Sequence, residues 1–592
     1  AGVTATIASR ILATSGDVGY SAFSKAGGGN LILSNPGNTM APGKIVLNGG
    51  GTVTISGITT NLGQSGSQTS KFLVGNFSSN NIVNVPGRLI TASVQVGRES
   101  FGGNSLNITG IGTDATPTLA GNGDNIYWVV GGYSSNNSLT VTTGADLQTN
   151  RGNGTNNFRI GEFAGSTGNS VTVTGAGARW RGDIPVSVGD GGSNNFLTVS
   201  DGGYANIARF LVGGDSGGVS NNNKVLITDL GSEFRTDQNS RYAWWRIGIG
   251  PGSSNNSFTV ANGATAWLRN AHVNGNFGIG VNNNTNNNYA RVTGVGSLLN
   301  INLLVPLTLG GVHNGGSLTD TTANGNHLDV FGGALMNSTT LELMGINSAF
   351  NLGDGTGMSI ATVGLTASYS PGVVLRNADS RLNFNSGNLI AGVDGAMVSG
   401  LGQIVLNGPA IVTTGFAGST ISNTLSGTGT FTKEGIGMLT LSAPNTSTGA
   451  TIVNAGTLTL DYATVADSKL NDSSALILGG GTLNLASGSH VEIIDSTTLT
   501  AGRSGVSVSN GTPVLRMNAI SPGVGMVNFG AASIASTSNA NDGSGILGVW
   551  ATVGGSDWAT RSGTLEGSGN YFITAYTGYT DINARGTSTI AN

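Results

Sequence analysis

The sequence predicts an all-β fold built from a repeated unit. Three observations carry the prediction: 100 of 592 residues are Gly, only 9% of residues are charged, and short stretches alternate between apolar and polar residues. Alternation with a period of two is typical of a strand that has one buried face. No helical periodicity lies between these stretches, which disfavours an α/β fold with helical crossovers.

The composition excludes several other classes of protein. A net charge of −4 with 38% apolar residues does not fit a disordered chain. The 25 Lys and Arg are too few to form a basic stripe for nucleic acid. The lack of Cys removes disulfides, thiolate catalysis and Cys-based zinc sites. No run of residues reaches the ~18 apolar positions of a membrane span, so no transmembrane segment is expected.

The first repeated pattern is an apolar residue, any residue, an apolar residue and then Gly. It recurs at a loose spacing of about thirty residues, as expected when insertions fall in loops. The pattern predicts an inward column of aromatic and aliphatic side chains. Its copies end at Gly75, Gly97, Gly131, Gly161, Gly189, Gly213, Gly248, Gly280 and Gly310.

The second pattern places an Asn two residues before the first inward residue of the next strand. Equivalent residues of successive coils in a solenoid lie one above the other, about 4.8 Å apart. Buried Asn side chains in that arrangement can bond amide to amide along the axis, so we expect a stacked column. Its members are Asn81, Asn104, Asn137, Asn169, Asn195, Asn223, Asn256, Asn288 and Asn326.

Three short strands with Gly-rich corners in each unit of about thirty residues predict one coil of a three-sided parallel β-solenoid. We expect the coils to stack into a single elongated rod. With ~28 residues per coil, the chain would form roughly 21 coils. At ~4.8 Å per coil the rod would be roughly 100 Å long.

Two segments near opposite ends of the chain match each other. Phe23-Ser-Lys25-Ala-Gly27 corresponds to Phe431-Thr-Lys433-Glu-Gly435, and each continues into a further pair of strands. The segment 427–460 resembles the autotransporter-associated β-strand repeat, and 21–56 resembles it as well. That resemblance implies a right-handed parallel β-helix, exported from the cell as the passenger region of a bacterial surface protein. Members of this family include adhesins and structural fibres, so the resemblance leaves the function open.

These patterns divide the chain into six predicted segments. They are an N-terminal strand or assembly segment (1–20), a first autotransporter-type repeat (21–60), nine degenerate coils (61–340), irregular coils without a confident register (341–420), a second repeat region (421–545), and a C-terminal strand-rich cap or assembly end (546–592). The chain opens with Ala1-Gly2-Val3 and no Met, which suits a mature chain after removal of a signal peptide.

The sequence predicts no catalytic residue, no metal site and no cofactor. No pair of carboxylates can be nominated as the acid and base of a glycosidase. Each His lacks a directly adjacent acidic residue and is expected to be a lone exposed side chain. Several Asp recur near turns, where turn chemistry explains them without a metal. The residues concerned are His272, His313, His327, His490, Asp190, Asp201, Asp215 and Asp229.

The densest aromatic and cationic cluster is the segment 241–246. Trp245 falls on the inward position of the first pattern, whereas Trp244 and Arg246 fall on the other face. We therefore name Trp244 and Arg246 as a candidate glycan-binding patch, with packing against a loop or a neighbouring subunit as the alternatives.

The ends of a solenoid present unpaired backbone groups, which invite pairing with another chain. Val3, Ala5 and Ile7 alternate like a strand near one end, and Ile573, Tyr576 and Tyr579 lie in an aromatic strand near the other. Contacts between two complementary ends would repeat into an open filament by β-augmentation. The alternative is that both ends fold back and cap their own solenoid.

The first hypothesis is accordingly a non-enzymatic structural protein that assembles head to tail into an extracellular filament. The low charge favours it, because few charges oppose association. The second hypothesis is a monomeric adhesin at the bacterial cell surface whose outward loops bind glycans. A polysaccharide-cleaving enzyme comes third, because no acid and base pair can be named.

Overall fold

The computed structural model describes most of the chain. The described residues are 2–11, 21–40, 44–61, 71–91, 93–112, 117–121, 127–149, 157–214, 218–236, 244–270, 276–303, 306–314, 317–320, 322–364, 372–392, 394–415 and 418–579. Within these ranges the regular elements are all β, and no helix is present that could cross a membrane.

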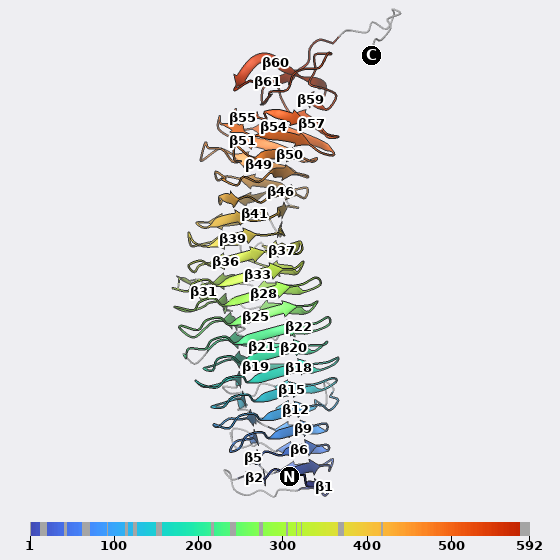
Figure 1. Cartoon of the computed structure of the whole chain (residues 1–592), viewed down its shortest axis with the longest axis vertical. Helices are drawn as coiled ribbons and strands as arrows, with labels where there is room; N and C mark the ends of the chain where they lie inside the picture. The colour runs from blue at the N-terminus through green and yellow to red at the C-terminus, as the bar shows by residue number, and fades with distance from the viewer. Residues whose placement is uncertain are drawn as a thin grey trace, which may run out of the picture. The chain divides into compact units, whose positions relative to one another are not determined.

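The chain forms two units. Unit 1 comprises residues 1–387 and 400–402, and unit 2 comprises residues 388–399 and 403–592. Each unit is built from strands that pair in parallel with their equivalents in the next coil (Figure 1). The predicted all-β parallel solenoid is therefore confirmed. The division into six segments stays a prediction.

Unit 1 has three columns of strands, one for each side of a coil. We call the first column face 1, and its strands alternate between buried and outward residues. Face 1 runs through β1 (Thr4–Ile7), β3 (Asn30–Leu33), β6 (Thr52–Ile55), β9 (Ile82–Val85), β12 (Ser105–Ile108), β15 (Ser138–Val141), β18 (Ser170–Thr174), β20 (Phe196–Ser200), β22 (Lys224–Thr228), β25 (Ser257–Ala261), β28 (Tyr289–Thr293), β33 (His327–Phe331), β36 (Ala349–Leu352) and β39 (Arg381–Phe384).

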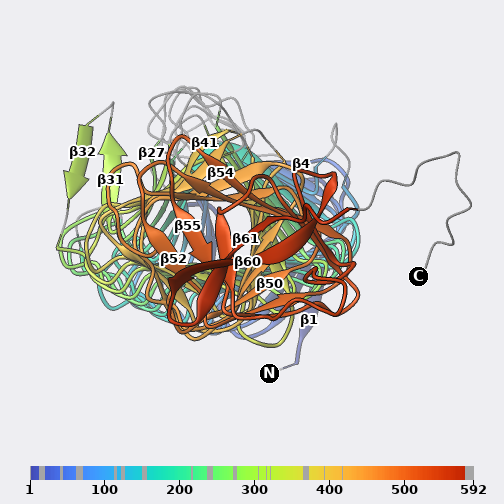
Figure 2. The ribbon, with the colours of Figure 1, turned by 90° about the horizontal axis from the view of Figure 1, so that it is seen from above.

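The second and third columns, face 2 and face 3, share two long strands, β19 (Arg179–Val188) and β21 (Tyr204–Val212). Face 2 includes β8 (Lys71–Val74), β11 (Ser93–Val96), β14 (Tyr127–Val130), β17 (Asn157–Ile160), β24 (Trp244–Ile247) and β27 (Asn276–Ile279). Face 3 includes β4 (Asn38–Met40), β7 (Ile58–Asn61), β10 (Arg88–Thr91), β13 (Leu119–Gly121), β16 (Asp146–Thr149) and β26 (Thr265–Asn270). A hairpin, β31 (Gly311–Asn314) with β32 (Ser317–Asp320), projects from the side of unit 1 (Figure 2).

The inward residues of the first pattern form one hydrophobic column in unit 1. Trp128, Phe158, Val186, Phe210, Trp245 and Phe277 follow one another through the strand register. Each is at most 1% exposed. Large aromatic side chains bury the most apolar area per residue, so this column supplies much of the stabilisation of the core.

The nine Asn residues of the second pattern lie in a second buried column, which we call the Asn column. Each is at most 2% exposed. The Oδ1 of one Asn accepts two hydrogen bonds, from the backbone N–H and the Nδ2 of the Asn one coil earlier, at 2.7–3.1 Å. All eight links point the same way along the coils, so the buried amides satisfy one another.

The Asn column also explains the Gly of the first pattern. Gly161 has φ +70°, and a Cβ added there would lie 2.2 Å from the Nδ2 of Asn195. A side chain at this position would therefore meet both a left-handed backbone and the neighbouring amide. The Gly of the first pattern therefore lies directly against an Asn of the second pattern. The same contact recurs between Gly131 and Asn169 and between Gly189 and Asn223.

The stretch 341–420, for which the sequence indicated no register, continues the same coils at least as far as β39. Ala349 pairs with His327, and Arg381 pairs with Ala349. Ser348 and Ser380 occupy the place of the Asn column here, each fully buried, and donate to backbone carbonyls. The Asn pattern therefore ends at Asn326 although the fold goes on.

Unit 2 is a solenoid of shorter coils. Its strands include β46 (Phe431–Glu434), β48 (Thr451–Val453), β49 (Thr457–Asp461), β52 (Val491–Ile493), β55 (Val514–Arg516) and β58 (Ala535–Thr537). Lys433 is fully buried, and its Nζ donates to the carbonyls of Glu434, Gly435 and Ala455 at 2.7, 2.9 and 3.2 Å. Its equivalent in unit 1, Lys25, donates to the carbonyl of Gly27 in the same way. The buried lysine of each passenger-type repeat therefore stabilises a turn by hydrogen bonds to its carbonyl groups.

Replacing Asn195 with Ala should strongly destabilise unit 1. The change removes the acceptor for two buried donors of Asn169 and leaves a gap, which we expect to cost about 3 kcal/mol or more. Guanidinium unfolding followed by the fluorescence of the buried Trp128, Trp180 and Trp245 measures it. Thr198→Ala, on the outward side of β20, is the control and should shift stability by about 0.5 kcal/mol at most. Equal unfolding midpoints for the two variants would contradict a stabilising role for the column.

Candidate functional site

A dense group of interacting side chains lies on the outward surface of face 1. We call it the outer cluster: Tyr289, Arg291, His327, Asp329, Phe331 and Asn351. Neighbouring strands bring it together, because Tyr289 pairs with His327, and Arg291 pairs with Asp329, which pairs in turn with Asn351. The residues that alternate with them along each strand point inward and fill the core. The cluster and the core therefore lie on opposite faces of the same strands.

Asp329 is the centre of the outer cluster. The Nε and Nη2 of Arg291 donate to its Oδ2 at 3.0 and 2.8 Å, and the Nδ2 of Asn351 donates to its Oδ1 at 2.8 Å. The Nε2 of His327 lies 3.6 Å from the same carboxylate. Although it is on an outward face, Asp329 is only 1% exposed, because these neighbours close over it. The carboxylate therefore fixes the positions of the three side chains around it.

Aromatic rings surround this ion pair. The rings of Tyr289 and His327 stack with centroids 5.1 Å apart and planes at 9°. The guanidinium of Arg291 lies 5.0 Å from the ring of Tyr289 and 5.2 Å from that of Phe331. Because the Arg291 side chain is still 36% exposed, its remaining donors face solvent. The cluster combines fixed polar groups with apolar ring surface, which is the combination that orients a polar organic ligand.

Sequence reasoning missed this cluster for an identifiable reason. It compared each His only with its direct neighbours in the chain, whereas residues two apart share one face of a strand. The prediction of lone His residues is wrong for His327, which is beside Asp329, and for His490, whose Nε2 lies 3.8 Å from the Oε2 of Glu492. His272 lies outside the described residues, and His313 lies in β31.

The predicted glycan patch is on face 2. The guanidinium groups of Arg209 and Arg246 lie 3.6 and 4.2 Å from the ring centroid of Trp244, which is half-buried. Trp245 is fully buried and meets Phe258 edge to face at 5.4 Å. Arginine side chains therefore cover part of the Trp244 ring. Glycan binding at this patch stays a prediction.

The predicted assembly residues have different environments. Val3 and Ala5 are exposed and Ile7 is half-buried on β1, which pairs in register with β3. At the other end, Tyr579 accepts a hydrogen bond from the backbone of Trp558 at 2.9 Å, and its ring meets that of Tyr576 at 5.2 Å.

Ile573 is the buried member of this set. It lies on β61 (Asn570–Ala575), which pairs antiparallel with β58 and with β60 (Asp557–Gly567). Ile573 is only 1% exposed, so its side chain packs within its own unit. Assembly through this end of the chain stays a prediction.

Unit 2 contains a buried polar network around Glu492 on β52. Glu492 is fully buried and accepts hydrogen bonds from the hydroxyl of Tyr462 at 2.7 Å and from the backbone of Lys469 and Leu470 at 3.0 and 2.6 Å. Burial raises its pKa to about 7 in spite of these donors, and the nearby Asp472 adds to the rise. Burial also lowers the pKa of Lys469 and of His490. The network fixes the loop at 462–474 to the strand.

The described residues contain no group of three or more His, Asp or Glu that could hold a metal ion. Asp190 pairs with Arg159 at 2.9 Å, and Asp201 accepts a hydrogen bond from Thr174 at 2.8 Å. Asp215 lies outside the described residues.

Comparison with known proteins agrees with this architecture. Residues 431–460 match the Passenger-associated-transport-repeat, which includes the buried Lys433. The resemblance predicted from 427–460 is thereby confirmed, and the β-solenoid carries a passenger-type repeat at these residues.

A curated relative extends the comparison. The chain is 25% identical, over 92% of its length, to a protein named Adhesin BmaC autotransporter from Brucella suis biovar 1 (strain 1330). The chain spans 18% of that relative. The two similarities support a surface adhesin-like passenger with a secreted or cell-surface location.

The stability of unit 2 should depend on pH because the pKa of Glu492 is raised in the folded state. Its folded pKa of about 7 exceeds its ordinary value of 4.5, so the folded state binds the proton more tightly than the unfolded state. Stability from this group is present below pH 4.5 and is lost as the pH rises to 7, by about 3 kcal/mol in total. Thermal unfolding of the wild type and of Glu492→Gln across pH 4–8 measures it. The variant should lack this decline, and two parallel profiles would contradict the assignment.

Proposed function

We propose that this chain is a non-enzymatic segment of an adhesin passenger and that the outer cluster is a glycan-binding site. The observation that carries the proposal is the buried Asp329, which fixes Arg291, His327 and Asn351 in one arrangement on an outward face. The similarity to an adhesin autotransporter supports the general role. The glycan is our proposal for the ligand.

The chemistry of the outer cluster favours binding over catalysis. Glycoside hydrolysis needs two carboxyl groups on either side of the scissile bond. Asp329 is the one carboxylate of the outer cluster, and the bidentate pair with Arg291 holds it as an acceptor. A sugar instead offers several hydroxyls to the exposed donors of Arg291 and the amide of Asn383, whose Nδ2 bonds Asn351 at 2.7 Å.

Preorganisation is the physical reason why such a site would bind. Side chains that are already ordered lose little conformational entropy when a ligand arrives. Arg291 is held by two hydrogen bonds and two rings, and Asn351 is held between Asp329 and Asn383. The filament hypothesis stays the alternative for the molecule, although the burial of Ile573 removes one of its proposed contacts.

Asp329→Asn should weaken glycan binding at least tenfold. The variant keeps the shape of the side chain but removes the charge that orients Arg291, and hydrogen bonds to charged groups contribute about 1.5–3 kcal/mol. Binding of the purified chain to a printed glycan array, followed by titration of the strongest hit, measures the effect. The matched control is Lys224→Ala, an exposed residue on the same face at β22.

Two further results decide the proposal. Arg291→Ala should reproduce the loss of binding. Both variants should still unfold in one cooperative transition, but at a lower free energy of unfolding than the wild type, because each breaks the pair between Arg291 and the buried carboxylate of Asp329. Unchanged binding by both variants, or no binding to any printed glycan, would refute a glycan site at the outer cluster.

A further inference from the structure

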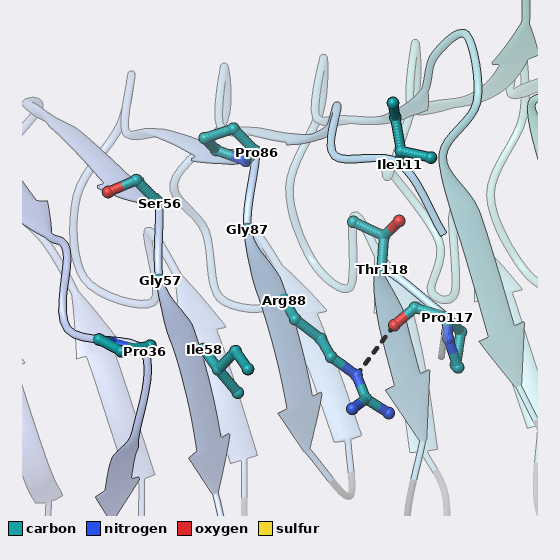
Figure 3. Close-up of a pocket in the computed structure, with 10 residues that line it drawn as sticks. All are labelled: Pro36, Ser56, Gly57, Ile58, Pro86, Gly87, Arg88, Ile111, Pro117 and Thr118. Atoms are coloured by element: carbon teal, nitrogen blue, oxygen red, sulfur yellow. Dashed lines mark hydrogen bonds between the residues drawn. The ribbon is translucent and has the colours of Figure 1, made fainter. Parts of the chain in front are cut away.

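A groove of about 290 Å³ follows one corner of unit 1 (Figure 3). It lies where the chain enters the face 3 strands β4, β7, β10 and β13, which pair with one another in successive coils. Its lining is about half polar and half apolar, and the apolar half comes from Pro36, Ile58, Pro86, Ile111 and Pro117. Ile58 is 37% exposed and Ile111 is 88% exposed, which is unusual for residues of this type.

The walls of the groove offer few free hydrogen-bond donors. The three prolines have no N–H, and the N–H groups of Gly57 and Gly87 donate to Leu33 and Ile55 of the preceding coil. The hydroxyl of Thr118 donates to the carbonyl of Gly110 at 2.6 Å. A peptide backbone in this groove would therefore find few partners for its own carbonyl groups.

Arg88 is the exception, and it is the charged residue of the groove. Its Nε donates to the carbonyl of Pro117 at 3.2 Å, which fixes the guanidinium (Figure 3). Its two terminal amino groups have no hydrogen-bond or ion-pair partner among the residues that the structure describes. A fixed guanidinium with free terminal N–H groups matches the fork of a carboxylate.

We propose that this groove binds an aliphatic carboxylate, such as a medium-chain fatty acid, with the carboxylate on Arg88 and the chain along the prolines and isoleucines. The charge complementarity selects an anionic head, and the lack of other free donors selects a tail without polar groups. The groove crosses four successive coils, a span of about 14 Å at 4.8 Å per coil, so the tail lies along the coil axis.

Titration with dodecanoate below its micelle concentration tests the proposal by isothermal calorimetry. The wild type should bind dodecanoate more tightly than decanoate and octanoate, because each methylene that leaves water strengthens binding by up to about fourfold. Dodecanol, which has the same tail without the charge, should bind at least tenfold more weakly. These comparisons need no variant and do not depend on the glycan proposal.

The Arg88→Gln variant provides a second test of the proposal. It should weaken dodecanoate binding at least tenfold and abolish the preference over dodecanol. Arg503→Gln, which removes the same charge at an exposed position in unit 2, should change neither. The proposal would be overturned if the wild type bound dodecanoate and dodecanol with equal affinity, if Arg88→Gln bound dodecanoate as tightly as the wild type, or if millimolar dodecanoate gave no heat.

Discussion

Every buried amide of the Asn column has to find its partner one coil away, and this requirement shapes the rest of unit 1. Unpaired buried amides are costly, so the column forms only when the coils keep one register. That register sets the inward aromatic column and requires Gly161 and its equivalents opposite the amides. It also sets the outward rows, because a slip by one residue would exchange the two faces of each strand.

The Asn column of unit 1 consists of neutral amides, which do not titrate. Unit 2 has fully buried ionisable groups, including Lys433 among carbonyls and Glu492 beneath a loop. Burial lowers the pKa of Lys433 to about 8 and raises that of Glu492 to about 7. The cost of charging these groups makes the stability of unit 2 depend on pH. Stability falls as the pH rises from 4.5 to about 7 through Glu492, and it rises as the pH goes from about 8 to 10.5 through Lys433.

A solenoid separates the residues that maintain the fold from those available for binding. Inward positions are fixed by packing, whereas outward positions can change without loss of the core. The outer cluster occupies outward positions of three neighbouring strands, and the groove beside Arg88 uses corners where prolines end the ladder. A solenoid built in this way can carry several unrelated binding surfaces along one scaffold.

The sequence by itself determined the strand pattern, the parallel solenoid, the members of the Asn column and the passenger-type repeat at 427–460. These features are local and recur from coil to coil, so period two and the spacing of Gly and Asn are enough to indicate them. The register of the coils beyond Asn326 was not predicted, because Ser348 and Ser380 replace Asn. Only the tertiary structure decided that His327 and Asp329 meet Arg291, that Ile573 is buried, and that Arg88 faces a groove. Those contacts join coils about twenty to forty residues apart, and their geometry depends on loop lengths that no single pattern fixes.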